Sequence, residues 1–349
     1  MVEVVMVLSE ASGPAMAAWL AQATGAAEAT VRHIERLGGG AIQENWAVDI
    51  VCRGGRLDGQ HRLVLRTDAS SRVAVSWDRS QEFRILEVAY HAGVTAPEPI
   101  ALCTDPTVLG RPFYLMRRVA GEARGFKLVR DPAVLARGEQ LVARLGAELA
   151  RLHHVAPPVA GLEFIPVPQG AAGLARVAGY RGHLDAMGSA ECVLEWALAW
   201  LERHAPAPVP PRLIHADFRT GNYLVEAGEL TAVLDWEFAG FGDPLEDLGW
   251  MLGKYWRFGA YQREAGGIGS REALLAGYEA EAGHGIDRAA VPYWEVMGTV
   301  RWAVIALMQA LRHFAGAEAS LELALTAHVL PVLELDLLTR VREIEETGQ

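Results

Sequence analysis

The chain has 349 residues, of which 51% are hydrophobic and 21% are charged, a balance typical of globular enzymes with room for two modest domains. Its formal net charge of −11 argues against nucleic-acid binding, which depends on basic surface. No apolar run approaches the roughly 18 residues needed to cross a bilayer, so we expect no membrane association. The first residues lack the features of a signal peptide, and three scattered cysteines predict neither a disulfide framework nor a zinc site. We therefore expect a cytoplasmic location.

The first third of the chain is predicted to be a small, mainly β lobe. An apolar stripe at 14–21 predicts a short leading helix. Extended segments are expected within 31–51, on both sides of a glycine-rich turn, and again at 61–66 and 113–116. Residues 80–92 carry apolar side chains at helical spacing, and Pro97 and Pro99 follow them.

The remainder of the chain is predicted to be mainly helical. Helices are expected at 132–154, at 192–204 and over several segments from 270 onward. Between them, residues 223–225 and 231–234 predict a β-hairpin. We therefore predict an α+β, two-lobed chain with an N-terminal lobe of residues 1–118 and a C-terminal lobe of residues 119–349. Such a plan places the active site in the crevice between the lobes.

One constellation of residues carries a clear chemical meaning. Residues 215–222 read His-Ala-Asp-Phe-Arg-Thr-Gly-Asn, and Asp235 follows Asn222 after a predicted hairpin. The amide oxygen of Asn222 and the carboxylate of Asp235 are the hard ligands that Mg²⁺ prefers. The carboxylate of Asp217 can accept the proton of an attacking hydroxyl. Because phosphoryl transfer needs alignment and charge neutralisation above all, this set predicts Mg²⁺-dependent phosphoryl transfer with Asp217 as the catalytic residue.

Residues 215–222 resemble the catalytic loop of the aminoglycoside phosphotransferase and choline kinase group. Asp235 matches the metal-binding aspartate of that group, and Gly-Asp-Pro-Leu-Glu-Asp-Leu at 242–248 is typical of it. The likeness extends from about Arg36 to the C-terminal helices, and the branch that the chain resembles most is the kinase-like domain linked to acyl-CoA dehydrogenases. The resemblance implies a protein-kinase-like bilobal fold, ATP or GTP as co-substrate and a small hydroxylated acceptor.

The resemblance also implies which residues of the first lobe contact the nucleotide. A glycine turn and the asparagine after it would cover the phosphates, an arginine–glutamate pair would bind them, and hinge residues would contact the adenine. In chain order these residues are Gly38, Gly39, Gly40, Asn45, Arg66, Glu82, Met116 and Val119. Most kinases carry lysine where this chain has Arg66, and the two side chains bind phosphate differently.

Several further polar residues are expected to serve structure. His215 is expected to orient its loop by hydrogen bonding, and Asp243 and Asp247 to brace the catalytic loop through backbone N–H groups. His153 ends a predicted helix, where it would interact with the helix dipole. Ala216 stands where many relatives have glycine. The chain lacks an Ala-Pro-Glu activation segment, so we expect no protein substrate.

The sequence leaves two classes of acceptor open. Residues 212–250 hold eight acidic and two basic side chains, which gives weak support for an aminoglycoside, whereas the dehydrogenase-linked resemblance favours a hydroxylated metabolite or a hydroxyacyl compound. A nucleotide-binding pseudokinase is the alternative outside catalysis, although Asp217, Asn222 and Asp235 are all present. A hydrolase that activates water through Asp217 is a remote third possibility. The residues predict no oligomeric state.

Overall fold

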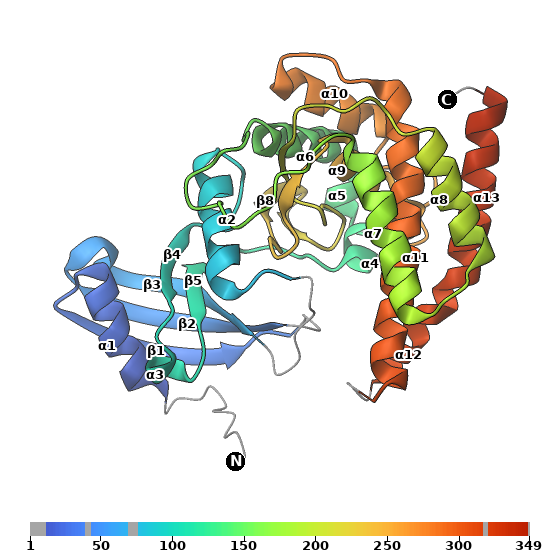
Figure 1. Ribbon diagram of the computed structural model, residues 1–349. Helices are drawn as coiled ribbons and strands as arrows, with labels where there is room; N and C mark the ends of the chain where they lie inside the picture. Colours follow the sequence, from blue (N-terminus) through green and yellow to red (C-terminus); the bar gives the residue numbers. More distant parts are fainter. Residues whose placement is uncertain (1–11, 39–42, 69–75, 317–319, 348–349) are drawn as a thin grey trace. The chain divides into compact units, whose positions relative to one another are not determined.

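The computed structural model describes residues 12–38, 43–68, 76–316 and 320–347 (Figure 1). The chain divides into two compact units, which are described separately below. One comprises residues 1–121 with 231–238, and the other comprises residues 122–230 with 239–349. The expected α+β composition is confirmed, since the first unit is built on a sheet and the second mainly on helices.

The first unit contains a five-stranded antiparallel sheet in the order β1-β2-β3-β5-β4. Its strands are β1 (Glu28–Arg36), β2 (Gln43–Arg53), β3 (Gly59–Asp68), β4 (Pro99–Cys103) and β5 (Phe113–Arg117). Three helices accompany them, namely α1 (Gly13–Thr24), α2 (Arg79–His91) and the short α3 (Pro106–Leu109).

Alternation along β3 determines what each face of the sheet carries. Leu63 and Leu65 are fully buried in the apolar cluster that also contains Met16 and Leu20 of α1. Arg66 is the next residue, so its side chain leaves the opposite face, where it pairs with Glu82 of α2. The period-two pattern thus separates an apolar core on one face from a charged cluster on the other.

Helix α2 begins as its sequence predicts. The Asp78 side chain accepts hydrogen bonds from the backbone N–H groups of Ser80 and Gln81, and the Gln81 side chain accepts one from the Asp78 N–H. This reciprocal capping box satisfies N–H groups that a helix cannot pair internally. The helix start therefore places Glu82 in the first turn, with its side chain buried.

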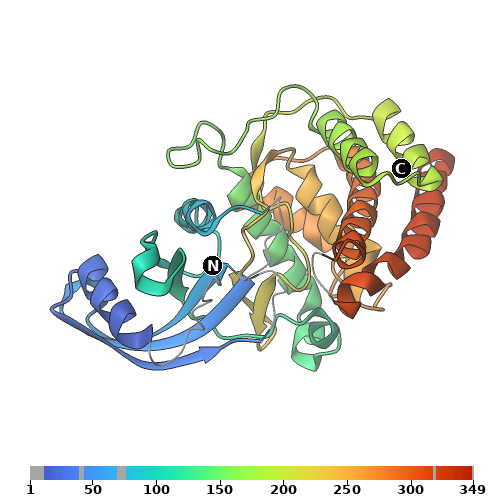
Figure 2. The same ribbon diagram turned by 60° about the horizontal axis from the view of Figure 1, so that its bottom comes forward.

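The second unit is mainly helical. Its helices are α4 (Gly125–Leu128), α5 (Pro132–Ala136), α6 (Gly138–His153), α7 (Ala172–Met187), α8 (Cys192–Arg203), α9 (Leu245–Leu252), α10 (Arg271–Ala282), α11 (Val291–Phe314), α12 (Leu321–Thr326) and α13 (Leu330–Thr347). Helices α7, α8, α9, α12 and α13 all pack against α11, which is therefore the centre of this part of the molecule (Figure 2). No helix in the described ranges combines the length and the apolar character that a bilayer crossing requires.

Short strands complete the second unit and its connection to the first. β6 (Arg212–Ile214) pairs with β9 (Gly240–Gly242), and β7 (Tyr223–Glu226) pairs with β8 (Glu229–Val233). The hairpin expected from the sequence is therefore present. The chain passes from the second unit into the first within β8 and returns after Phe238.

The single helix expected at 132–154 is wrong, because the chain forms α5 and α6 with a break between them. Arg137 leaves helical geometry, with φ −121° and ψ 16°. Gly138 follows, and a Cβ there would lie 2.5 Å from the carbonyl oxygen of Ile268. The backbone of a neighbouring segment thus approaches so closely that a side chain does not fit at this position.

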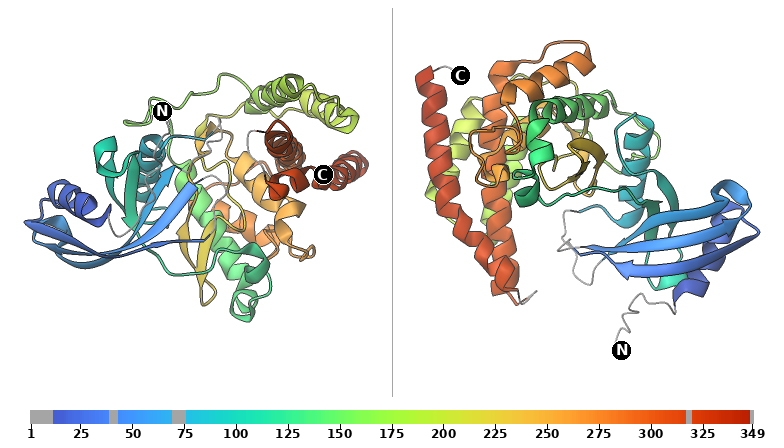
Figure 3. Two further views of the ribbon diagram at one scale, coloured as in Figure 1. Left: turned by 90° about the horizontal axis from the view of Figure 1, so that it is seen from below. Right: turned by 180° about the vertical axis from the view of Figure 1, so that it is seen from behind.

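Helices α6 and α10 pack backbone to backbone (Figure 3). A Cβ on Gly146 of α6 would meet the Leu274 carbonyl oxygen at 2.2 Å, and a Cβ on Gly277 of α10 would meet the Ala143 carbonyl oxygen at 2.1 Å. Both distances are well inside van der Waals contact, so each glycine makes room for the other helix. α6 also carries His153, which reaches the catalytic loop region described below.

We predict that Gly277→Ala lowers the free energy of unfolding by about 2 kcal/mol, because the added methyl group meets rigid backbone and forces the two helices apart. The matched control is Gly179→Ala in α7, where a Cβ has nothing within 4 Å. There the exchange should stabilise the helix by about 0.5–1 kcal/mol through propensity alone. Chemical denaturation measures both, and equal effects at the two positions would contradict the close packing.

Candidate active site

The first unit contains a buried ionic cluster around Arg66. Its Nε donates to Glu82 Oε2 at 3.2 Å, and its Nη2 lies 3.0 Å from Glu82 Oε1. The same Nη2 donates to Asp235 Oδ1 at 2.5 Å. Only 6% of the Arg66 side chain and 1% of the Glu82 side chain are exposed. The structure therefore forms the expected Arg66–Glu82 pair and adds Asp235 to it.

Arg79 is a second arginine in this cluster, and sequence reasoning missed it. It donates through Nη1 to Glu82 Oε2 and through Nη2 to the Trp77 carbonyl oxygen at 2.9 Å. Its Nε lies 2.9 Å from Asp68 Oδ1. The signal for it was the i,i+3 spacing from Arg79 to Glu82 in the first turn of a helix. Two guanidinium groups thus hold the Glu82 carboxylate in place.

Asp235 occupies an unusual backbone conformation, with φ 64°. Residues other than glycine seldom adopt this left-handed region, and such positions often mark functional sites. Its side chain is 37% exposed, although one carboxylate oxygen accepts from the buried Arg66. Burial raises the pKa of nearby Glu237 to about 7, an effect that Arg66 opposes and Asp235 reinforces. Asp235 therefore keeps an accessible carboxylate oriented by a fixed cation.

In the second unit, three donors hold the carboxylate of Asp217. Asn222 Nδ2 donates to Oδ2 at 2.6 Å, while Trp250 Nε1 and Arg219 Nε donate to Oδ1 at 2.9 Å and 3.3 Å. Asn222 Nδ2 also donates to the Asp217 carbonyl oxygen at 2.9 Å. The Asp217 side chain is 14% exposed. Its position is therefore fixed, yet it is not fully covered.

The amide of Asn222 meets the requirement for a ligand of a hard cation. Both of its N–H donors are used by Asp217, so its Oδ1 is the atom left for a further contact. Oxygen of this kind, together with a partly exposed carboxylate such as that of Asp235, is what Mg²⁺ prefers. Asn222 belongs to the second unit and Asp235 to the first, so their joint use as metal ligands stays a prediction.

Asp247 of α9 braces the catalytic loop, as expected. Its Oδ2 accepts from the backbone N–H of His215 at 2.7 Å, and its Oδ1 accepts from the backbone N–H of Ala216 at 2.8 Å. Burial would raise the pKa of Asp247, but hydrogen bonding from His153 and the positive potential of both neighbouring histidines hold it below its ordinary value. Ala216 has a positive φ of 59°, a conformation that glycine adopts without the strain that a Cβ brings, which fits the glycine that many relatives have there.

His215 behaves as expected, His153 lies in the last turn of its helix as expected but has further contacts, and the role predicted for Asp243 is wrong. The His215 Nδ1 accepts from the Asp217 N–H at 3.2 Å, so this buried ring orients the loop. His153 is no simple dipole partner, because it lies buried between Asp247, at 3.1 Å from Nε2, and the Tyr278 hydroxyl, at 3.0 Å from Nδ1. Asp243 does not brace the loop but accepts from the N–H of Leu245, the first residue of α9, at 2.9 Å.

The remaining predicted nucleotide contacts lie in the first unit. Asn45 stands opposite Arg66 in the β2–β3 ladder, and Met116 stands opposite Val64 in the β3–β5 ladder. Gly38 follows β1, and Val119 follows β5. Gly39 and Gly40 lie outside the described residues. The contacts of these residues with a nucleotide stay predictions.

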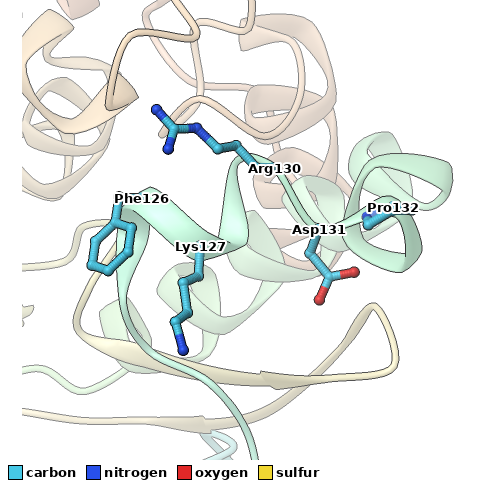
Figure 4. A pocket seen from close by; sticks show the side chains of 5 residues that line it. All are labelled: Phe126, Lys127, Arg130, Asp131 and Pro132. Atoms are coloured by element: carbon cyan, nitrogen blue, oxygen red, sulfur yellow. The ribbon is translucent and has the colours of Figure 1, made fainter.

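A surface cavity of about 420 Å³ lies elsewhere, on the segment from α4 to the start of α5 (Figure 4). Its lining residues are Phe126, Lys127, Arg130, Asp131 and Pro132. None of them belongs to the predicted set. This hollow therefore does not mark the site built around Asp217.

Replacing Arg66 should disturb the first unit more than replacing an exposed arginine. We predict that Arg66→Gln lowers the free energy of unfolding by about 2 kcal/mol, less than for most buried ion pairs because Arg79 still neutralises Glu82. Arg84→Gln, which breaks the exposed pair with Glu87 on the same helix, should change it by less than about 0.5 kcal/mol. Denaturant titration measures the free energy of unfolding of both variants. Equal losses in the two would show that burial of the Arg66 cluster contributes nothing to stability.

Asp243 should make stability depend on pH. Burial raises its pKa from 3.8 to about 6, so the unfolded chain releases this proton first and stability is lost as pH rises from about 4 to 6. Asp243→Asn keeps an acceptor for the Leu245 N–H and removes the buried charge. We predict that the variant gains about 3 kcal/mol over the wild type at pH 8 and less than about 1 kcal/mol at pH 4. A gain of equal size at both values, measured by urea unfolding, would contradict this assignment.

Comparison with known proteins supplies the family. The family model described as "Phosphotransferase enzyme family" matches residues 33–291. Mouse acyl-CoA dehydrogenase family member 10 is 30% identical over 203 residues, which are 56% of this chain and only 18% of the mouse protein.

Solved structures agree on the fold. A Ralstonia eutropha protein, provisionally named an aminoglycoside phosphotransferase, has a TM-score of 0.73 at 19% identity, with 94% of this chain and 98% of that chain covered. An aminoglycoside phosphotransferase solved with GDP and kanamycin has a TM-score of 0.57 at 16% identity, covering 88% and 94%. This chain therefore belongs to the phosphotransferase enzyme family and has the kinase-like α+β fold of that family, as expected from its catalytic loop.

Proposed function

We propose that this phosphotransferase moves the γ-phosphate of ATP or GTP to a hydroxyl group of a small molecule in a Mg²⁺-dependent reaction. The observation that carries the proposal is the Asp217 carboxylate, which receives three hydrogen bonds and is still partly accessible. A carboxylate fixed in this way can orient an acceptor hydroxyl and take its proton.

In the proposed reaction, the acceptor oxygen forms a bond to the γ-phosphorus while the bond from that phosphorus to the β-phosphate oxygen breaks. The hydroxyl proton passes to Asp217, and the nucleoside diphosphate leaves. Asn222 and Trp250 keep the carboxylate oriented throughout, since each donates to a different oxygen. Asp247 fixes the backbone on which Asp217 is carried.

Asn222 and Asp235 would hold the magnesium ion. When bound, Mg²⁺ neutralises charge on the phosphates and thereby favours transfer. Asn222 offers its amide oxygen, because Asp217 uses both N–H donors, and Asp235 offers a carboxylate that is 37% exposed. These features support the assignment of both residues as ligands.

The nucleotide-binding role falls to residues 1–118 in this proposal, and the catalytic loop and acceptor site to residues 119–349. Arg66, fixed by Glu82, would bind phosphate oxygens, and the glycine turn at 38–40 with Asn45 would cover them. Met116 and Val119 would contact the base. The co-substrate in this proposal is ATP or GTP, and a fold relative solved with GDP supports a guanine nucleotide as one of the two candidates.

Two acceptor classes follow from the comparisons. An aminoglycoside is suggested by the neighbour that was solved with kanamycin, at 16% identity. A hydroxylated metabolite or hydroxyacyl compound is suggested by the matched segment of the mouse acyl-CoA dehydrogenase family member 10, at 30% identity. A catalytically inactive nucleotide-binding protein is disfavoured, because binding alone does not need a carboxylate as firmly oriented as Asp217.

The test compares Asp217→Asn with Asp185→Asn, an exchange of the same kind at an exposed position on α7. We predict that Asp217→Asn lowers Mg²⁺-dependent transfer from labelled ATP or GTP by about 10²–10⁴-fold, the range for loss of a general base. Nucleotide affinity, measured by calorimetry, should stay within a factor of two or so, because Asp217 faces the acceptor. Full transfer in the Asp217 variant would remove this residue from its role, and Asp185→Asn should match the wild type.

A further inference from the structure

Arg301 of α11 carries a positive charge that the protein itself does not neutralise. Its guanidinium carbon lies 4.5 Å from the centroid of the Trp250 ring. The side chain is half-buried, and among the described residues no carboxylate lies within ion-pair distance of it. A cation–π contact with tryptophan contributes roughly 0.5–2 kcal/mol, which is weak compensation for removing a cation from water.

Trp250 connects this cation directly to the catalytic loop. The same indole that stacks with Arg301 donates its Nε1–H to Asp217 Oδ1 at 2.9 Å. The indole is 2% exposed, so its position is fixed by packing. The Trp250 indole therefore separates Arg301 from the Asp217 carboxylate, which would accept the proton of the acceptor hydroxyl.

The other arginines near this site have acidic partners. Arg219 stacks on Trp256 at 4.3 Å, but it also donates to Asp217. Arg176 of α7 donates to Glu246 at 3.1 Å. Both arginines thus have a carboxylate partner, which Arg301 lacks within the described part of the chain.

The one acidic residue of α11 is occupied elsewhere. Glu295 lies about two turns before Arg301 in the same helix and accepts from Arg271 at 3.0 Å through Oε2. Arg340 of α13 lies 3.4 Å from the same oxygen. Because two other guanidinium groups already share this carboxylate, it does not serve as a counter-ion for Arg301.

The remaining ionisable neighbours of Arg301 include two tyrosines. Burial raises the pKa of Tyr180 on α7 and of Tyr255 after α9, and the positive charge of Arg301 acts in the opposite direction on both. The Tyr255 hydroxyl is buried without a hydrogen-bond partner in the described structure. Neutral phenols supply no counter-charge for Arg301 at ordinary pH.

We propose that Arg301 binds an anionic group, a carboxylate or a phosphate, on the acceptor, and that the acceptor is therefore a hydroxylated organic anion and not a polycationic aminoglycoside. The inference rests on the proposed role of Asp217 at the acceptor hydroxyl. A guanidinium group can donate two parallel hydrogen bonds to either anion while its face stays on the indole. The indole keeps the anionic group apart from the Asp217 carboxylate, which limits their repulsion.

The experiment uses matched acceptors that differ only in charge. Straight-chain hydroxy acids from glycolate to hydroxyhexanoate are compared with their amides, glycerol phosphate with glycerol, and kanamycin is included as a polycation. Transfer from labelled ATP and GTP is measured with Mg²⁺, and binding of each compound is measured by calorimetry with a non-hydrolysable nucleotide present. The proteins are the wild type, Arg301→Gln and Arg342→Gln, the last of which removes an exposed arginine of α13.

We predict that the best anionic acceptor has a kcat/KM at least about ten-fold above that of its neutral partner. In Arg301→Gln this advantage should disappear. The KM for the anionic acceptor should rise while the KM for the nucleotide stays unchanged. A general structural defect would not produce this combination, because it would affect both substrates. Arg342→Gln should behave as the wild type.

The inference would be overturned by equal use of charged and neutral acceptors, by kanamycin as the best acceptor, or by a preference for anionic acceptors that survives Arg301→Gln. Absence of binding by every anion would also overturn it, even if nucleotide binds. Failure of the proposed function has a different signature, namely anions that bind through Arg301 but receive no phosphate.

Discussion

One face of helix α9 determines the geometry of the catalytic loop. Asp247 accepts the backbone N–H groups of His215 and Ala216, and Trp250, three residues later on the same helix, donates to the side chain of Asp217. Residues at this spacing lie one above the other, so a single rigid element fixes three consecutive loop residues. The same constraint explains why His153 of α6 is buried beside Asp247, since its Nε2 lies within hydrogen-bond distance of the carboxylate that holds the loop. The position of Asp217 thus depends on helix packing as well as on three residues of its own loop, His215, Arg219 and Asn222.

In the first unit, ion pairs hold the functional side chains in position. Its sheet places Arg66 on the face opposite the apolar core, and Glu82 fixes the guanidinium from the first turn of α2. Arg79 doubles the positive charge around Glu82. Glu82 thus lies between two arginines and Arg66 between two carboxylates, so each buried charge is held by partners of opposite sign. The exposed edge of this network is Asp235, the residue proposed to contact the metal.

The sequence predicted those parts of the structure that depend on local pattern. Four strands of the first unit and α2 follow from alternation and helical spacing, although β4 was not predicted, and Asp217 and Asn222 follow from the spacing of the catalytic loop. The break between α5 and α6 could not be predicted, because it depends on the close approach of Ile268, which is far away in the sequence. The contact of His153 with Tyr278 likewise depends on the fold, whereas Arg79 had a local signal in its i,i+3 spacing to Glu82.

Composition and structure lead to different expectations for the charge of the acceptor. A net charge of −11, and an excess of acids between residues 212 and 250, favour a cationic acceptor when every charge is counted equally. In the structure, Asp247 is occupied by backbone and histidine donors, Glu246 is paired with Arg176, and Asp243 accepts from the Leu245 N–H. These three carboxylates are therefore engaged within the protein, whereas Arg301 has no ion-pair partner among the described residues. The charge that a site offers to a ligand depends on what internal pairing leaves over, and in our proposal Arg301 supplies positive charge beside Asp217.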